Sequence, residues 1–138
     1  MPRRPTGAVN FDFATQRVAR LATVDESGQP HVVPVTFALD GDVVYIAVDH
    51  KPKTTRNLKR LRNIDANPYV SLLVDHYTDD WTQLWWIRAD GTATILRDPA
   101  TFAEPRRLLA AKYPQYQEFP PQGPIIRIDI THRASWHG

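Results

Sequence analysis

The sequence predicts a mainly β protein of the α+β class, folded as a small antiparallel barrel with short peripheral helices. Short apolar segments recur along the chain with turn residues between them, a spacing typical of antiparallel β structure. Most of these segments follow one another through hairpin-like turns, and one helical segment is inserted in the middle of the series. This order favours a barrel over a parallel α/β sheet, in which helices alternate with strands.

The whole chain, residues 1–138, is expected to form one domain. It is 42% hydrophobic and 23% charged, which is enough to build a buried core. Residues 1–9 are expected to be a loose arm, and their basic start is not expected to be a signal peptide because no apolar stretch follows it. No apolar run is long enough to cross a membrane, and the absence of cysteine fits a cytoplasmic protein.

The first half of the chain is expected to contain a short helix followed by three strands. Asn10 has the side chain of a helix N-cap, and an apolar stripe follows it. The strands are expected at residues 19–24, 31–39 and 42–48. Gly28 marks the first turn, and the Asp40-Gly41 pair predicts a hairpin between the second and third strands.

Pro34 interrupts the second of these strands. Proline has no N–H to donate to a strand ladder, so it is expected at a sheet edge or at a bulge. Two interpretations stay open at this point. Either the strand is an ordinary edge strand, or the backbone near Pro34, Val35 and Thr36 is free to bond a ligand.

The second half is expected to contain two helices and at least three strands. The first helix is opened by Thr54 or Thr55 and stopped by Asn67-Pro68, and the second starts at Asp98-Pro99. The strands are expected at residues 69–76, 81–89, 92–97 and 125–130, where 92–97 either continues the strand before it or pairs with it. A loop is expected over residues 113–124 and a tail after residue 130.

The segment from Tyr45 to Arg62 combines features that can hold a phosphate. An apolar strand ends, a loop carrying Lys51 and Lys53 follows, and a helix then begins at a threonine. A helix N-terminus offers unpaired N–H groups and the positive end of a dipole, and the two lysines add full charges beside it. A solvated basic helix is the alternative, but the position of the lysines at the helix entrance favours an anion site.

The same helix is expected to have a cationic face beside an apolar one. At the helical repeat, the residues on the cationic face are Lys53, Arg56, Asn57 and Arg60. Leu58 and Leu61 lie together on a neighbouring face. One face can therefore pack on a sheet while the other stays available to a negatively charged ligand.

The sequence lacks the motifs of most hydrolases, metalloenzymes and dinucleotide-binding enzymes. The 5 histidines show no zinc-ligand spacing, and there is no Gly-x-Ser-x-Gly, no P-loop and no Gly-x-Gly-x-x-Gly. No acid, base or nucleophile stands out, and we expect no catalytic side chain and no metal. A phosphate site in such a chain suits an enzyme whose cofactor does the chemistry.

Two adjacent tryptophans, Trp85 and Trp86, fall inside one expected strand. Their rings must therefore point to opposite faces of the sheet. One ring can fill the barrel, whereas the other lies on the outer face, where a bare aromatic ring is unfavourable. A second subunit or a planar ligand is expected to cover it.

The chain resembles the pyridoxamine 5'-phosphate oxidase-like proteins, which have an antiparallel split β-barrel that binds FMN in many members. The resemblance is carried by four segments in the right order, residues 20–37, 41–48, 53–58 and 67–74. It covers about residues 14–131 and is strongest to the actinobacterial branch that is predicted to use coenzyme F420, an 8-hydroxy-5-deazaflavin. Residues 81–91 are also similar to that branch.

The resemblance implies a homodimer with two cofactor sites at the subunit interface. It places the cofactor phosphate at Lys51, Lys53 and Thr54, and the acidic tail of F420 along Arg56, Asn57 and Arg60. The backbone that would face the flat ring is that of Pro34, Val35, Thr36, Ala47 and Val48. Tyr77 and Trp81 would reach in from the second subunit.

Two departures from the flavin-binding members favour F420 over FMN. Those members often carry an Arg-Lys pair at the phosphate and Thr or Ser at the ring, where this chain has Pro52-Lys53 and Ala47. The extra positive charge on the helix also suits the polyglutamate tail of F420.

The expected function is hydride transfer between F420 and a planar conjugated acceptor, such as a quinone, an enone or a tetrapyrrole. An FMN-dependent oxidase or reductase and a non-catalytic cofactor carrier stay open as alternatives. A nucleic-acid binder is a fourth hypothesis that we do not expect, because a net charge of +2 supports it only weakly.

Overall fold

The computed structural model describes residues 12–48 and 55–138, without the side chains of residues 55–58. Its strands are β1 (Ala19–Val24), β2 (Pro30–Val35), β3 (Ala38–Asp40), β4 (Val43–Ala47), β5 (Tyr69–His76), β6 (Trp85–Leu96) and β7 (Ile125–His137). Its α-helices are α2 (Thr55–Ala66), α3 (Ala103–Lys112) and α4 (Pro114–Glu118), and its 3₁₀ turns are η1 (Trp81–Gln83) and η2 (Pro99–Thr101). Residues 12–15 form a further short helical turn.

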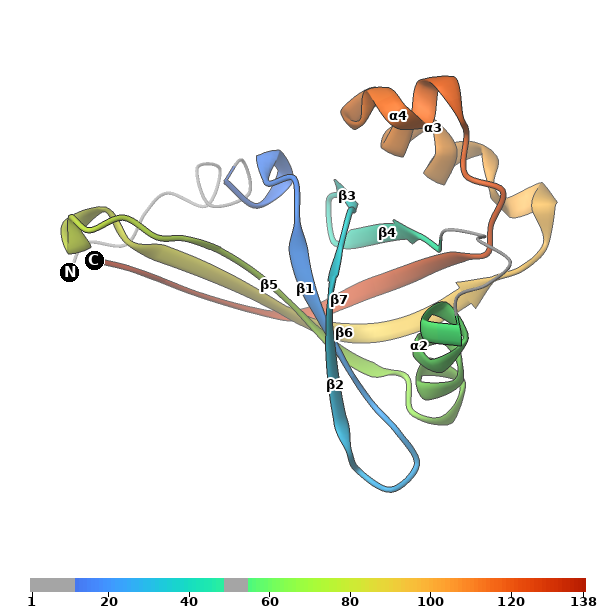
Figure 1. Cartoon of the computed structure of the whole chain (residues 1–138), viewed down its shortest axis with the longest axis horizontal. Coiled ribbons are helices and arrows are strands. Elements are labelled where there is room, and N and C mark those ends of the chain that lie inside the picture. Colours follow the sequence, from blue (N-terminus) through green and yellow to red (C-terminus); the bar gives the residue numbers. More distant parts are fainter. Residues whose placement is uncertain (1–11, 49–54) are drawn as a thin grey trace.

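The seven strands form one antiparallel sheet in the order β2-β1-β5-β6-β7-β4-β3. The two edge strands, β2 and β3, are consecutive in the sequence and only Thr36 and Phe37 lie between them. The three Cα–Cα steps from Val35 to Ala38 span at most about 11 Å, so the sheet must curl until its two edges come together at this point. This confirms the expected fold, a mainly β split barrel with short helices around it (Figure 1).

The core has two parts. The larger one fills the barrel with apolar side chains from the strands, together with Leu61 and Ile64 of α2. The smaller one lies under the helical segment between β6 and β7, where Phe102, Leu109 and Tyr113 pack on Ala38, Tyr45 and Ala47 of β3 and β4. In Figure 1, α3 and α4 lie on one side of the sheet and α2 on the other.

The strands expected at residues 19–24 and 69–76 are confirmed as β1 and β5, whereas the second expected strand is divided. Residues 31–39 were expected to be continuous, but the pairing changes from β1 to β4 at Thr36 and Phe37. The expected hairpin at Asp40-Gly41 joins β3 to β4, with Gly41 at φ 59°.

The strands expected at residues 81–89 and 92–97 are one strand, β6, which starts at Trp85 and not at Trp81. Residues 92–97 continue the strand before them, because Asp90-Gly91 is a β-bulge against β7 and not a turn. Trp81 lies outside this strand, in η1, where the Asp80 carboxylate accepts a hydrogen bond from the Thr82 N–H. The segment expected to start the strand is therefore a 3₁₀ turn with Asp80 as its N-cap.

The last part of the chain is more regular than expected. β7 runs to His137 instead of ending at residue 130, because its second half pairs with β6 beyond the bulge. The expected loop over residues 113–124 contains α4, which starts at Pro114 in the first helical position. The expected helix after Asp98 is divided at Phe102 into η2 and α3.

Residues 1–9, expected to be a loose arm, lie outside the described residues. In the described part of the chain, no helix is long and apolar enough to span a membrane.

Candidate functional site

The ends of β2 and β4, expected to face a cofactor ring, are brought to the same corner of the barrel. β3 and β4 pair up to Ala38 opposite Tyr45, and Thr36 and Ala47 each lie two residues beyond this last pair, at the same end of the ladder. The side chains of Val35, Ala47 and Val48 are buried, so ligand contacts at these positions are left to the backbone. The Val48 N–H already donates to the Pro124 carbonyl at 3.1 Å.

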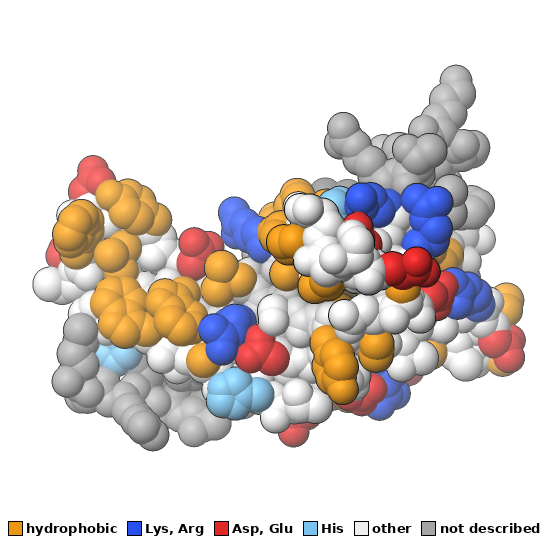
Figure 2. Space-filling view, turned by 90° about the horizontal axis from the view of Figure 1, so that it is seen from below, with side chains coloured by type: hydrophobic (Ala, Val, Ile, Leu, Met, Phe, Trp, Pro, Cys, Tyr) orange, Lys and Arg blue, Asp and Glu red, His pale blue; other side chains and the backbone are white. Residues whose placement is uncertain are grey.

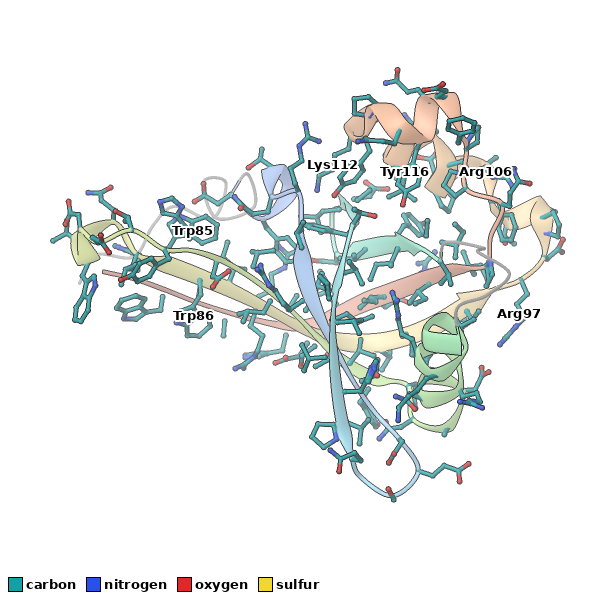
Figure 3. The ribbon with its side chains drawn as sticks, in the orientation of Figure 1. Trp85, Trp86, Arg97, Arg106, Lys112 and Tyr116 are labelled. Carbon is teal, nitrogen blue, oxygen red and sulfur yellow. The ribbon has the colours of Figure 1, made fainter. Side chains whose placement is uncertain are left out.

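The backbone between β2 and β3 is held by side chains at the end of α3 and in α4. The Phe37 N–H donates to the Tyr113 hydroxyl at 3.1 Å, and Lys112 Nζ donates to the Phe37 carbonyl at 3.0 Å. The Thr36 Oγ1 and the Tyr116 hydroxyl are hydrogen-bonded at 3.0 Å. Figure 3 shows Lys112 and Tyr116 on the side of the helices that faces the sheet.

Lys112 is the most perturbed base of this region. Burial, and after it the charge of Arg17, lowers the pKa of Lys112 to about 8. Its ammonium also lies 3.7 Å from the centroid of the Phe37 ring, a cation–π contact that favours the charged form and opposes the shift. Burial raises the pKa of Tyr113, so its hydroxyl stays protonated and can donate to the Arg17 carbonyl at 2.8 Å. Sequence reasoning missed these residues, because their partners lie far away along the chain.

The predicted phosphate site lies mostly outside the described part of the chain. Lys51, Lys53 and Thr54 are not described, nor are the side chains of Arg56 and Asn57. The helix that would receive the phosphate is present, since α2 starts at Thr55 as expected and buries Leu61 in the core. These assignments stay predictions.

The described half of α2 carries positive charge and is fixed to the barrel by a buried polar pair. Asn63 Nδ2 donates to Thr23 Oγ1 at 3.1 Å, and both side chains are buried. Arg60 is half-buried and Arg62 is exposed. A groove of about 380 Å³ runs beside this half of the helix, lined by Asp25, Glu26, Ser27, Lys59, Arg62, Asn63 and Ala66. Its lining has both signs of charge, so it is a poorer anion site than the helix entrance.

Tyr77 and Trp81 are not brought to the barrel corner within one subunit. They follow β5 at the far end of the sheet from α2, and each is 69% exposed (Figure 1). Beside them, His76 stacks on Trp85 with ring centroids 6.0 Å apart, in a groove of about 290 Å³ that also includes His137. In a single chain these aromatic residues cannot share a ligand with the backbone of Thr36 and Ala47.

The outer face of β1, β2, β5, β6 and β7 mixes large apolar side chains with the ion pairs Arg20–Asp75 and Arg88–Asp90. The pairing registers place Ala22 between Val32 and Ser71, and Trp86 between Asp75 and Trp136. The exposed large apolar residues on this face are Val32, Leu73 and Trp136. Figure 2 shows hydrophobic side chains gathered over the end of the sheet formed by β5, β6 and β7. Trp85 and Trp86 lie on opposite sides of the sheet, as expected (Figure 3).

Among the described residues, no group of three or more histidine, aspartate or glutamate side chains is placed to hold a metal ion.

The joined edges of the antiparallel sheet define a split-barrel protein. The family model described as pyridoxamine 5'-phosphate oxidase matches residues 6–137, and the chain belongs to this family. No curated protein sequence matches the chain.

Solved structures share the fold at low sequence identity. A conserved hypothetical protein from Mycobacterium tuberculosis has a TM-score of 0.74 and 18% identity, over 98% of this chain and 86% of the other. A FAD-binding protein from Mesorhizobium loti has a TM-score of 0.71 and 22% identity, over 96% and 94% of the two chains. HutZ, the heme storage protein from Vibrio cholerae, has a TM-score of 0.73 and 16% identity, over 98% and 95%. At these identities the matches show a shared fold.

Proposed function

We propose that the protein is an oxidoreductase that uses coenzyme F420 and transfers a hydride between it and a planar conjugated small molecule. The observation that carries this proposal is the convergence of Thr36 and Ala47 at the barrel corner, on the sheet that leads into the basic helix α2. When bound, F420 supplies the hydride chemistry. The residues of this chain bind and orient it, so the lack of an evident acid or base in the sequence does not argue against an enzyme.

The residues near the corner fit a flat, phosphorylated ligand. The buried side chains of Val35, Ala47 and Val48 put backbone, and no bulky side chain, where a ring would lie. Lys51, Lys53 and Thr54 would hold the phosphate at the entrance of α2. Arg56, Asn57 and Arg60 would follow the acidic tail of F420, which gives this cofactor an electrostatic advantage over FMN.

We further propose that the working unit is a homodimer formed through the outer face of the sheet. Val32, Leu73 and Trp136 are exposed on this face of one subunit beside the ion pairs Arg20–Asp75 and Arg88–Asp90, and exposed large apolar side chains among polar ones are typical of an interface. A second copy would also supply Tyr77 and Trp81 to the site, which one subunit holds at the opposite end of the sheet.

A flavin-dependent enzyme is the second candidate, and the FAD-binding protein from Mesorhizobium loti is the observation that favours it. Such an enzyme would use the same barrel corner and the same phosphate site with FMN or FAD. HutZ adds a third possibility, a haem-binding protein without turnover. The three differ in the ligand that binds tightly, and so one experiment separates them.

The test is a parallel titration of the purified apoprotein with F420, FMN, FAD and haem, followed by absorbance and fluorescence. We expect micromolar or tighter binding of F420 and weaker binding of the other three. The complex with reduced F420 should then reduce a quinone or an enone faster than reduced F420 alone. Tight binding of a flavin or of haem with weak binding of F420 would reject the proposed cofactor, and F420 binding without turnover on any acceptor would indicate a carrier.

A further inference from the structure

The two residues that join the sheet edges take their hydrogen bonds from outside the sheet. β2 ends at Val35 and β3 begins at Ala38, so Thr36 and Phe37 belong to neither strand. Phe37 is fully buried, and a buried backbone group without a partner is strongly unfavourable. Tyr113 accepts from its N–H and Lys112 donates to its carbonyl, so the end of α3 replaces the missing ladder.

These residues of α3 are themselves fixed to the start of the barrel. The Tyr113 hydroxyl donates to the Arg17 carbonyl at 2.8 Å, two residues ahead of β1. The Arg17 guanidinium donates back to the Lys112 carbonyl and lies 5.5 Å from the centroid of the Tyr113 ring. The position of Phe37 is therefore set by a closed arrangement of three chain segments and not by one flexible contact.

The same helical segment also holds the other half of the corner. We use the name cap for residues 98–124, from Asp98, the N-cap residue of η2, to the residue before β7. In the cap, Arg106 Nε donates to the Pro121 carbonyl at 2.6 Å, and a Cβ on Gly123 would lie 2.4 Å from the Phe102 ring. The Pro124 carbonyl at the end of this packed loop accepts from the Val48 N–H. The cap is therefore hydrogen-bonded to Phe37, between β2 and β3, and to Val48, directly after β4.

We infer that the cap positions the backbone that contacts the cofactor ring, and that Tyr113, Tyr116 and Lys112 are positioning residues of this site. The ligand-binding part of this inference rests on the proposed function, because the inference takes the barrel corner as the ring site. Ring binding needs backbone groups held to within about half an ångström, which a two-residue link without ladder bonds does not provide alone. The Tyr113 and Tyr116 hydroxyls supply that constraint through Phe37 and Thr36.

The structural part is tested in the apoprotein, without any ligand. Tyr113→Phe keeps the ring and its packing but removes the acceptor of the Phe37 N–H. We expect amide hydrogen exchange over residues 36–38 to accelerate about tenfold or more, the factor that corresponds to one lost hydrogen bond. Glu104→Gln is the matched control, because it removes an exposed ion pair with Arg107 on α3 and leaves the corner untouched. Equal exchange in Tyr113→Phe and the wild type would overturn the inference.

The ligand part is tested with two pairs of probes, F420 with its phosphate-free ring-ribityl fragment and FMN with riboflavin. FMN and riboflavin differ only in the phosphate, whereas F420 and its fragment differ in the phosphate and in the acidic tail attached to it. The affinities are measured far below the unfolding temperature. For a pair that the wild type binds, we expect Tyr113→Phe and Tyr116→Phe to lower the affinity for both members by the same factor of about ten. A role limited to stability would leave these affinities unchanged, which would contradict the inference.

The two tests separate the inference from the proposed function. If the wild type binds no probe, the proposed cofactor class is rejected, and the exchange experiment alone decides whether the cap holds the corner. If the wild type binds a probe and the variants bind it equally well, the proposed function stands and the positioning role is rejected.

Discussion

At the residue scale, Lys112 of the cap makes the free energy of unfolding depend on pH. Its pKa is lowered from 10.5 to about 8, with burial as the main cause. In the folded state Lys112 therefore loses its proton at a lower pH than in the unfolded chain. Between these two values the unfolded chain binds more protons, and so this residue makes the free energy of unfolding rise with pH.

This gives a prediction for Lys112→Met, which has no titrating group. Between pH 8 and 10 the stability of the wild type should rise relative to that of the variant, because only the wild type gains from the release of this proton. Below pH 7 the difference between the two proteins should be constant. Urea denaturation at several pH values measures it, and parallel stability curves for the two proteins would show that the pKa of Lys112 is not lowered.

The buried pair between Asn63 and Thr23 is a second prediction at this scale. Thr23→Val keeps the shape of the side chain but leaves the Asn63 amide without its partner inside the barrel. We expect a loss of about 1–3 kcal/mol in the free energy of unfolding. The double variant Thr23→Val/Asn63→Leu should recover part of it, since both polar groups are then gone. Denaturant titration of the wild type, Thr23→Val, Asn63→Leu and the double variant checks this, and additive losses in the double variant would contradict it.

At the scale of elements, the bulge at Asp90-Gly91 allows β6 and β7 to run on as two long paired strands. A Cβ at Gly91 would lie 2.3 Å from the carbonyl oxygen of Asp129, on the backbone of β7. We therefore expect Gly91→Ala to lower the free energy of unfolding by about 1–3 kcal/mol through overpacking. Thr94→Ala, at an exposed position further along the strand, is the control for a mutation in β6. A thermal unfolding midpoint for Gly91→Ala equal to that of the wild type would show that the bulge has more room than this distance allows.

Residues that end a helix or form a turn determined which strands and helices the sequence analysis placed correctly. Asn67-Pro68 ends α2 and starts β5, and both boundaries agree with the structure because proline limits the backbone within one or two residues. The division between β2 and β3 was missed for the opposite reason. Phe37 bonds to Tyr113, and nothing within a local window reveals a partner that lies in another helix.

The same distinction applies to the candidate site. The residues expected at the ring were identified from the resemblance and from Pro34, and the structure brings Thr36 and Ala47 to one corner. The residues that hold this corner, Lys112 and Tyr113, come from a segment that the proline and glutamine content partly marked as a loop. Their role depends on tertiary contacts, which a single sequence does not display.

At the scale of the whole molecule, we predict a homodimer. The reason is the group of exposed large apolar side chains on the outer face of the sheet, Val32, Leu73 and Trp136. Light scattering after size exclusion should give twice the mass of one chain, and Trp136→Glu should shift it towards the monomer because it buries a charge in the interface. Phe119→Glu is the control, since Phe119 is 73% exposed but belongs to the cap. A wild-type monomer, or a monomer with Phe119→Glu alone, would contradict the proposed interface.

The central claim is that a phosphorylated deazaflavin binds at the corner formed by Thr36, Ala47 and the start of α2. The most direct measurement is a calorimetric titration of F420 into the wild type, Lys53→Ala and Arg107→Gln. Arg107 is an exposed arginine of α3 paired with Glu104, so its loss controls for the change in net charge. The account predicts one F420 per chain with wild-type affinity in Arg107→Gln and at least a tenfold loss in Lys53→Ala, as for a charge-assisted phosphate contact. Equal affinity in Lys53→Ala and the wild type, or no F420 binding at all, would contradict it.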